Sequence, residues 1–139
     1  MPRQTAPHIS LCPFIRSLSP TGVVIFVAGF LLEAVADWQK EVWRAVPSNR
    51  GRWIDSGLWS WSRHPNYLGE ILLWTGMAVL AAAGLAPDAG SVAAAAASPL
   101  FVAFLLTKVS GIPLLEAAAQ KRWGKLKEFK AYKARVRVL

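Results

Sequence analysis

The feature that most constrains this chain is a set of three apolar runs, each of which needs a hydrophobic environment. The clearest run covers residues 66–86 and contains one charge, Glu70; the others cover residues 21–36 and 92–115. A soluble domain of 139 residues has too little interior for a chain that is 54% hydrophobic and 17% charged. The sequence therefore predicts an all-α integral membrane protein with about three transmembrane helices.

The segments around these runs have distinct characters. Residues 1–20 are rich in proline and predict an irregular lead-in, followed by one membrane domain over residues 21–139. The first helix should continue past the apolar run until Pro47 ends it. Residues 47–65 then form a loop too irregular to lie in lipid. Residues 116–139 combine helically spaced apolar residues with many cations, which predicts a basic amphipathic helix at a membrane surface.

The formal net charge of +8 is distributed unevenly along the chain. The cations lie between and after the apolar runs, an arrangement that a nucleic-acid-binding module would not tolerate, so we expect no nucleic-acid partner. The turn between the second and third runs carries only Asp88. The positive-inside rule therefore predicts a multi-pass protein whose basic loop, residues 38–65, and C-terminal tail are both cytoplasmic. A phosphate-bearing cofactor from the cytosol would meet both segments.

Metal-ligating residues are scarce. Cys12 is the only cysteine, and His8 and His64 are the only histidines. These residues provide no thiolate cluster and no closely spaced pair of imidazoles, so we expect no metal site.

The first candidate site lies on one face of the first helix. Glu33, Asp37, Lys40 and Arg44 follow spacings of four, three and four residues. We interpret Lys40 as part of a solvated, ion-paired helix end. Glu33 and Asp37 are better candidates for function, because carboxylates in or beside a membrane span are costly and usually functional.

A second cluster surrounds the start of the second span. Backbone N–H groups at a helix start, together with nearby cations, favour an anionic phosphate. Interfacial anchoring explains the same residues equally well. The tryptophans at positions 38, 43, 53, 59 and 61 are interpreted mostly as an aromatic belt. The sequence contains neither a dinucleotide-binding glycine motif after a strand nor a P-loop. The residues of the second cluster are Arg50, Arg52, Arg63, His64, Asn66, Tyr67 and Glu70.

The stretch GLWSWSRHPNYLGE, with the preceding ADWQKEVWRAV, resembles the C-terminal domain of the steroid 5-alpha-reductase family, especially its bacterial membrane members. The later run SGIPLLE resembles that family's closing segment. The related isoprenylcysteine carboxyl methyltransferases share an Arg-His-Pro motif, but Asn66 and Glu70 resemble the reductase branch.

The resemblance implies a membrane-bound oxidoreductase that binds NADPH and reduces a carbon–carbon double bond of a steroid-like or lipid-like substrate. It implies that the protein orients the cofactor and stabilises charge, with Tyr67 as a candidate proton donor. The cofactor-binding residues that it implies are Asp37, Arg44, Arg52, Arg63, His64, Asn66, Tyr67, Glu70 and Arg122.

Two alternatives remain open. The Arg63-His64-Pro65 motif also fits a methyltransferase of the isoprenylcysteine type, whose cofactor would be S-adenosylmethionine. In the steroid reductases, the residues that polarise the substrate carbonyl lie in an N-terminal half with no counterpart here. The chain could then be a non-catalytic membrane fragment, or a subunit whose partner supplies the missing transmembrane helices.

Overall fold

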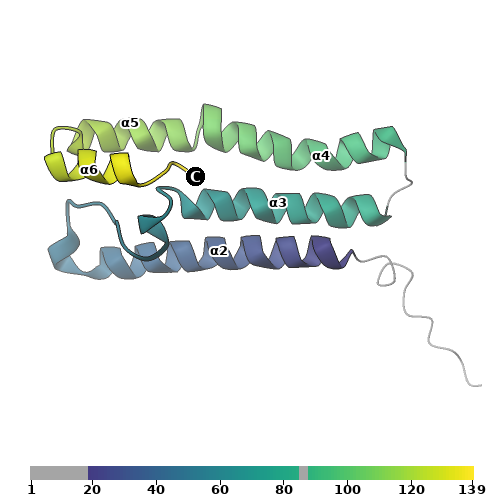
Figure 1. Cartoon of the computed structure of the whole chain (residues 1–139), viewed down its shortest axis with the longest axis horizontal. Helices are drawn as coiled ribbons and strands as arrows, with labels where there is room; N and C mark the ends of the chain where they lie inside the picture. Colours follow the sequence, from purple (N-terminus) through teal and green to yellow (C-terminus); the bar gives the residue numbers. More distant parts are fainter. Residues whose placement is uncertain (1–18, 85–87) are drawn as a thin grey trace, which may run out of the picture.

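The computed structural model describes residues 19–84 and 88–139, and helices dominate both parts (Figure 1). The described residues contain no strand, only one isolated bridge between Ser62 and Arg137. The all-α prediction is confirmed, whereas most of the expected lead-in lies outside the described residues. The elements are α2 (Pro20–Ala45), η1 (Pro47–Asn49), η2 (Gly57–Ser60), α3 (Pro65–Gly84), α4 (Ala89–Phe104), η3 (Leu105–Val109), α5 (Ile112–Trp123) and α6 (Lys127–Arg135).

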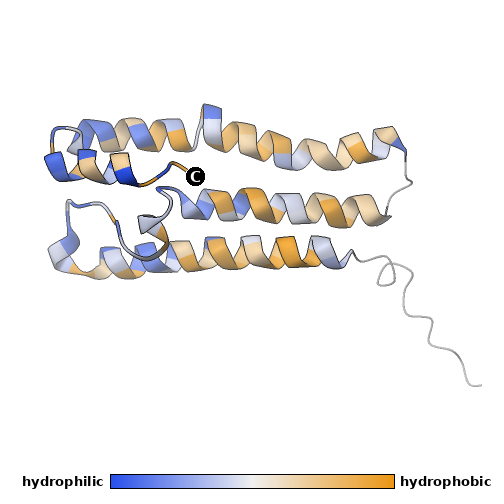
Figure 2. Ribbon diagram, in the orientation of Figure 1, coloured by the Kyte–Doolittle hydropathy of each residue, from blue (hydrophilic) through white to orange (hydrophobic). Residues whose placement is uncertain are grey.

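Three helical runs are long and apolar enough to cross a membrane, as the sequence predicted. They are Pro20–Ala45, Pro65–Gly84 and Ala89–Trp123, and Figure 2 shows their apolar residues gathered along the same part of the molecule. The first begins where the Ser19 side chain accepts a hydrogen bond from Gly22 N at 3.3 Å. It ends just before Pro47, because proline cannot continue a helix.

The third run is longer than residues 92–115. It extends to Trp123 and changes its winding at η3, a π-helix that contains Lys108. Pro113 does not end the run, because it lies in the first turn of α5, where its missing N–H is tolerated. The first residues assigned to the basic tail therefore continue the third helical run.

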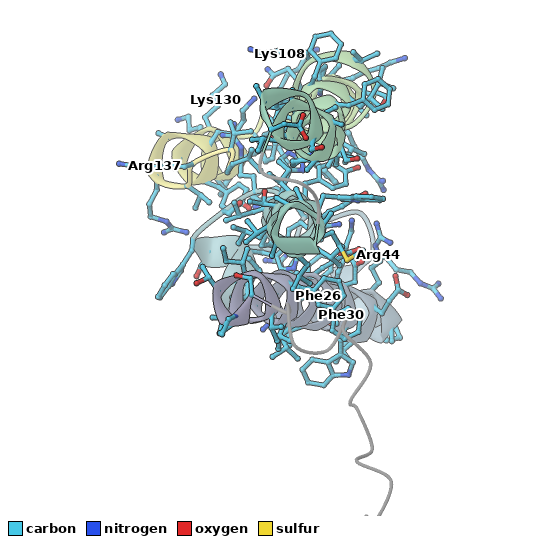
Figure 3. The ribbon with its side chains drawn as sticks, turned by 90° about the vertical axis from the view of Figure 1, so that its right-hand side faces the viewer. Phe26, Phe30, Arg44, Lys108, Lys130 and Arg137 are labelled. Carbon is cyan, nitrogen blue, oxygen red and sulfur yellow. The ribbon has the colours of Figure 1, made fainter. Side chains whose placement is uncertain are left out.

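Helices α2 and α3 pack closely because glycines face each other between them. A Cβ atom added at Gly29 would clash with the Leu73 backbone, and one added at Gly76 would clash with the Phe26 backbone. Small residues allow such close approach in membrane helices, where van der Waals packing drives association. Helix α3 also packs on α4, so the three spans stand in a row with α3 in the middle (Figure 3).

The loop after α2 and the C-terminal tail pack against each other at one end of the row. Arg63 N donates to Arg137 O at 2.9 Å, and the Ser62 hydroxyl donates to Val138 O at 3.2 Å. The two basic segments therefore lie at the same end, as the charge pattern required. The assignment of this end to the cytoplasm stays a prediction.

The aromatic face of α6 packs on protein. Phe129 and Tyr132 are only 3% and 6% exposed, and they form a buried cluster with Val136 against Trp53 and Trp123. The predicted basic amphipathic C-terminal helix is present, but the expectation that Phe129 and Tyr132 face a membrane surface is wrong, because α6 folds back along α5 and buries them. Its outward face is basic instead.

The tryptophans divide into two groups. Trp59 is 5% exposed and belongs to a core cluster with Ala36 and Ile54, whereas Trp38 and Trp61 are 64% and 83% exposed. The aromatic-belt interpretation therefore suits Trp38 and Trp61. It is wrong for Trp53 and Trp59, which pack between the loop and the helices.

Candidate functional site

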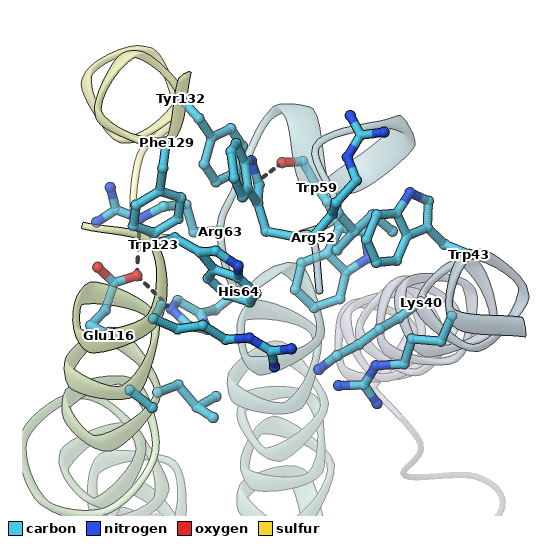
Figure 4. Close-up of a pocket in the computed structure, with 17 residues that line it drawn as sticks. Lys40, Trp43, Arg52, Trp59, Arg63, His64, Glu116, Trp123, Phe129 and Tyr132 are labelled. Atoms are coloured by element: carbon cyan, nitrogen blue, oxygen red, sulfur yellow. Dashed lines mark hydrogen bonds and ion pairs between the residues drawn. The ribbon is translucent and has the colours of Figure 1, made fainter. Parts of the chain in front are cut away.

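A cavity of about 270 Å³ opens at the end where the loop and the tail meet (Figure 4). The end of α2 forms one side and α5 the other, while the loop and α6 close the top. Its walls combine cationic and aromatic side chains that are distant in the sequence. The lining residues are Lys40, Trp43, Arg44, Arg52, Trp53, Ile54, Trp59, Arg63, His64, Leu115, Glu116, Ala118, Ala119, Arg122, Trp123, Phe129 and Tyr132.

The aromatic wall is fixed by specific contacts. Trp53 meets the Phe129 ring edge-on with centroids 5.0 Å apart. Trp59 Nε1 donates to Ala36 O at 3.0 Å, and the Tyr132 hydroxyl donates to Trp59 O at 2.9 Å. Burial raises the pKa of Tyr132 to about 12, so this phenol stays neutral and keeps its proton for that hydrogen bond.

One polar atom of this wall has no partner within the described part of the chain. The Trp53 indole Nε1 is buried and makes no hydrogen bond there. Buried N–H groups are nearly always paired, so this unpaired indole is an exception within the wall.

The cations of the cavity differ in what they already bind. Lys40 Nζ lies 4.9 Å from the Trp59 ring centroid, and Arg122 Cζ lies 5.0 Å from that of Trp123. Lys40 is therefore part of the cavity wall, and its interpretation as a solvated helix end is wrong. Arg44 makes only an exposed 3.4 Å ion pair with Glu41.

Arg63 is committed to the protein itself. Its Nη1 donates to Lys133 O at 3.1 Å and to Val136 O at 3.4 Å. Its Nε lies 3.1 Å from Glu116 Oε1, within ion-pair distance, although the N–H does not point along a hydrogen bond. Because its guanidinium fastens the tail to the loop, Arg63 has less capacity to neutralise a phosphate than the sequence suggested.

Glu116 is the one acidic residue of the cavity wall. Its Oε1 lies 3.1 Å from His64 Nε2, and its Oε2 lies 3.1 Å from Lys133 Nζ. A single carboxylate of α5 thereby joins the loop, the start of α3 and helix α6. Sequence reasoning did not single out Glu116; the available signal was an isolated acid between an apolar run and a basic tail.

His64 is held as a neutral donor. The carboxylate of Glu116 has no proton to give, so His64 Nε2 carries the hydrogen in their 3.1 Å contact. Burial lowers the pKa of His64 below its ordinary value of 6.5, although the hydrogen bond that His64 donates to Glu116 acts in the opposite direction. The imidazole also stacks on Tyr67, with centroids 5.7 Å apart and planes 10° apart.

A second polar group lies where α2 and α3 pass each other. Asn66 Nδ2 donates to Asp37 Oδ1 at 3.1 Å. Glu33 and Glu70 lie within electrostatic range of each other. Asp37 and Glu70 both lie within electrostatic range of the Tyr67 phenol. None of these residues lines the cavity, but Lys40 is one turn along α2 from Asp37, and His64 stacks on Tyr67.

The structure thus divides the predicted site residues between two neighbouring groups. Asp37, Asn66, Tyr67 and Glu70 belong to the group between α2 and α3, whereas Arg50 lines neither place. Among the described residues, no set of three or more His, Cys, Asp or Glu side chains is placed to hold a metal ion. The predicted residues that line the cavity are Arg44, Arg52, Arg63, His64 and Arg122.

Comparisons with known proteins identify relatives of the sequence. The model of the family described as "Protein of unknown function (DUF1295)" matches residues 5–136. A segment of 65 residues is 37% identical to the "Probable O-methyltransferase ustE" of Ustilaginoidea virens. That match covers 47% of this chain and only 22% of the relative. No solved structure matches.

Proposed function

The chain belongs to the DUF1295 family, which is steroid 5-alpha-reductase-like, and we propose that it binds NADPH as a membrane oxidoreductase. The observation that carries this proposal is the composition of the cavity. It combines five basic side chains with a single acid, Glu116, on an aromatic wall. The cations are Lys40, Arg44, Arg52, Arg63 and Arg122.

Charge favours NADPH over S-adenosylmethionine in this cavity. NADPH carries several phosphate charges, which arginines bind through paired N–H donors. S-adenosylmethionine instead brings a sulfonium cation, which would face this excess of positive charge. Glu116, the acid that could compensate it, already contacts Arg63, His64 and Lys133.

The aromatic wall fits the base of a nucleotide. Stacking of bases on aromatic side chains is favourable and needs no sequence motif. A volume of about 270 Å³ is near the lower end for small-molecule sites, so the cavity would hold one end of a dinucleotide.

The Asp37–Asn66 pair would then receive the other end. Carboxylate and amide groups match the donor and acceptor atoms of the nicotinamide carboxamide. NADPH, when bound, supplies the hydride for one carbon of the substrate double bond. Tyr67, which stacks on His64, is the proposed proton donor to the second carbon. The apolar spans would give an apolar, steroid-like or lipid-like substrate access from the bilayer.

A methyltransferase is the second candidate, favoured by one observation. The curated relative named a probable O-methyltransferase shares 37% identity over 65 residues, although the match spans 22% of its length. The activity of a protein so much longer transfers to this chain only as a proposal.

The decisive experiment compares binding of the two cofactors to the purified chain in detergent. NADPH should quench the tryptophan fluorescence, whereas S-adenosylmethionine should have little effect. Because hydrogen bonds to charged groups contribute about 1.5–3 kcal/mol, Arg52→Gln or Arg122→Gln should weaken NADPH binding by roughly tenfold or more.

Arg50→Gln is the matched control, because Arg50 is an exposed arginine of the same loop that does not line the cavity. Asn66→Ala should also weaken NADPH binding if the cofactor reaches α3. Binding of S-adenosylmethionine alone would reverse the ranking of the two functions. Equal losses in the Arg50 and Arg52 variants would show that general charge, and not the cavity, attracts the cofactor.

A further inference from the structure

Trp61 is the most exposed of the large apolar residues that the structure describes, at 83%. Its neighbour two positions earlier, Trp59, points inward and donates to Ala36 O. The η2 turn therefore commits one indole to the core and leaves the other outside. An exposed indole is unfavourable in water but well suited to the boundary between lipid and water, where its apolar body and its N–H both find partners.

The end of the C-terminal segment lies beside the residues that follow this tryptophan. Ser62, the residue after Trp61, forms the isolated bridge with Arg137, and Arg63 N donates to Arg137 O at 2.9 Å. Val136 is 2% exposed, so in this extended segment the next side chain, Arg137, turns outward. Figure 3 shows Arg137 projecting away from the helices.

The cations here are not neutralised by the protein. Arg135 and Arg137 are exposed, and neither has an ion-pair partner within the described residues. Their position along the molecule is defined by α3. The span Pro65–Gly84 begins three residues after Ser62, so Arg137 lies at the level where α3 would enter the bilayer, and Arg135 precedes it by two residues at the end of α6.

We propose that Trp61, Arg135 and Arg137 form a binding site for the headgroup of an anionic phospholipid. The guanidinium groups would bind the lipid phosphate through paired N–H donors, and the indole would lie at the level of the glycerol backbone. Clusters of cations next to a transmembrane helix attract anionic lipids for this reason. A zwitterionic headgroup lacks the net negative charge and would bind more weakly.

The structure favours a local site over diffuse attraction by the basic tail. Lys125 and Lys127 are also exposed, but they lie at the turn between α5 and α6. Helix α6 separates this turn from the Ser62–Arg137 bridge, which places the two lysines far from the start of α3 (Figure 1). Removing charge at the two ends of α6 should therefore have different effects.

The test measures binding of a fluorescent phosphatidylglycerol and a fluorescent phosphatidylcholine to the purified full chain in neutral detergent. Phosphatidylglycerol should bind more tightly. Each arginine near an anionic lipid surface contributes about 1 kcal/mol to the binding free energy. Arg135→Gln and Arg137→Gln should therefore each weaken phosphatidylglycerol binding by about fivefold. Trp61→Ser should weaken the binding of both phosphatidylglycerol and phosphatidylcholine. The double variant Lys125→Gln, Lys127→Gln, which removes twice the charge of either single arginine variant, should retain phosphatidylglycerol binding.

A competition with glycerol 3-phosphate distinguishes a lipid site from a site for free phosphate. The lipid proposal predicts no displacement at concentrations where unlabelled phosphatidylglycerol displaces the probe. Displacement by glycerol 3-phosphate, equal binding of both lipids, or equal losses in the lysine and arginine variants would each overturn the proposal. Circular dichroism of every variant checks that the helices persist.

Discussion

The Glu116 carboxylate lies 3.1 Å from the His64 imidazole, which connects the third helical run to the residue just before the second. The same carboxylate contacts Arg63 and Lys133, so it fastens the loop and the tail to one place on α5. These contacts lie in the wall of the cavity between the loop, the tail and α5.

Glu116→Gln should therefore destabilise the protein. The substitution removes the negative charge that lies 3.1 Å from both Arg63 and Lys133, and it weakens the hydrogen bond that His64 donates, which as a bond to a charged group is worth about 1.5–3 kcal/mol. Thermal unfolding in detergent should show a lower Tm. Glu128→Gln is the matched control, since Glu128 is an exposed acid on α6. Equal Tm values for the two variants would contradict the structural role of Glu116.

Stability should decrease as the pH falls below about 7, because of His64. The pKa of His64 is lowered in the folded state, so the unfolded chain, with a value near 6.5, binds the proton more readily. The contribution of neutral His64 to the stability of the fold is fully present above pH 6.5. It is lost as the pH falls toward the lower pKa that His64 has in the folded state. Tm measured at several pH values in wild type and in His64→Gln checks this expectation.

His64→Gln should show a flatter dependence of Tm on pH than the wild type below pH 6.5. His8→Gln provides the control, because His8 is the only other histidine. If the dependence of Tm on pH became flatter in His8→Gln and not in His64→Gln, the pH effect would come from His8, which would contradict the prediction.

The two tyrosines of the chain permit a direct test of the Tyr132 environment. In Tyr67→Phe, the remaining phenol should ionise only near pH 12, because burial disfavours the tyrosinate. Ultraviolet absorbance of tyrosinate during a pH titration measures this directly. The same variant unfolded in denaturant should titrate near 10. Ionisation near 10 in the folded state, with helicity intact by circular dichroism, would show that Tyr132 is not buried.

The glycine contacts between α2 and α3 predict a steric effect. Gly76→Ala should lower Tm, because the new Cβ atom meets the Phe26 backbone, which has no room to move aside. Gly84→Ala at the end of the same helix should be close to neutral, since its Cβ meets no described atom within 4 Å. The same Tm for both variants would argue against close packing at Gly76.

The candidate site was only partly predictable. Asp37 and Asn66 were expected together, and they share a hydrogen bond although they are 29 residues apart. Arg63 was expected to meet a ligand, yet it binds carbonyl groups of Lys133 and Val136 instead. Spacing shows which residues share a helix face, but it does not show what the tail will place against that face.

The sequence by itself determined the three apolar helices, the all-α class and the gathering of cations beyond the spans. These properties follow from local composition and from interactions within a helix, so they need no knowledge of distant partners. Only the tertiary structure decided that Glu116 meets His64 and that Tyr132 meets Trp59, 73 residues away. The first contact depends on α5 lying beside the start of α3, and the second depends on α6 folding back so that its aromatic face is buried.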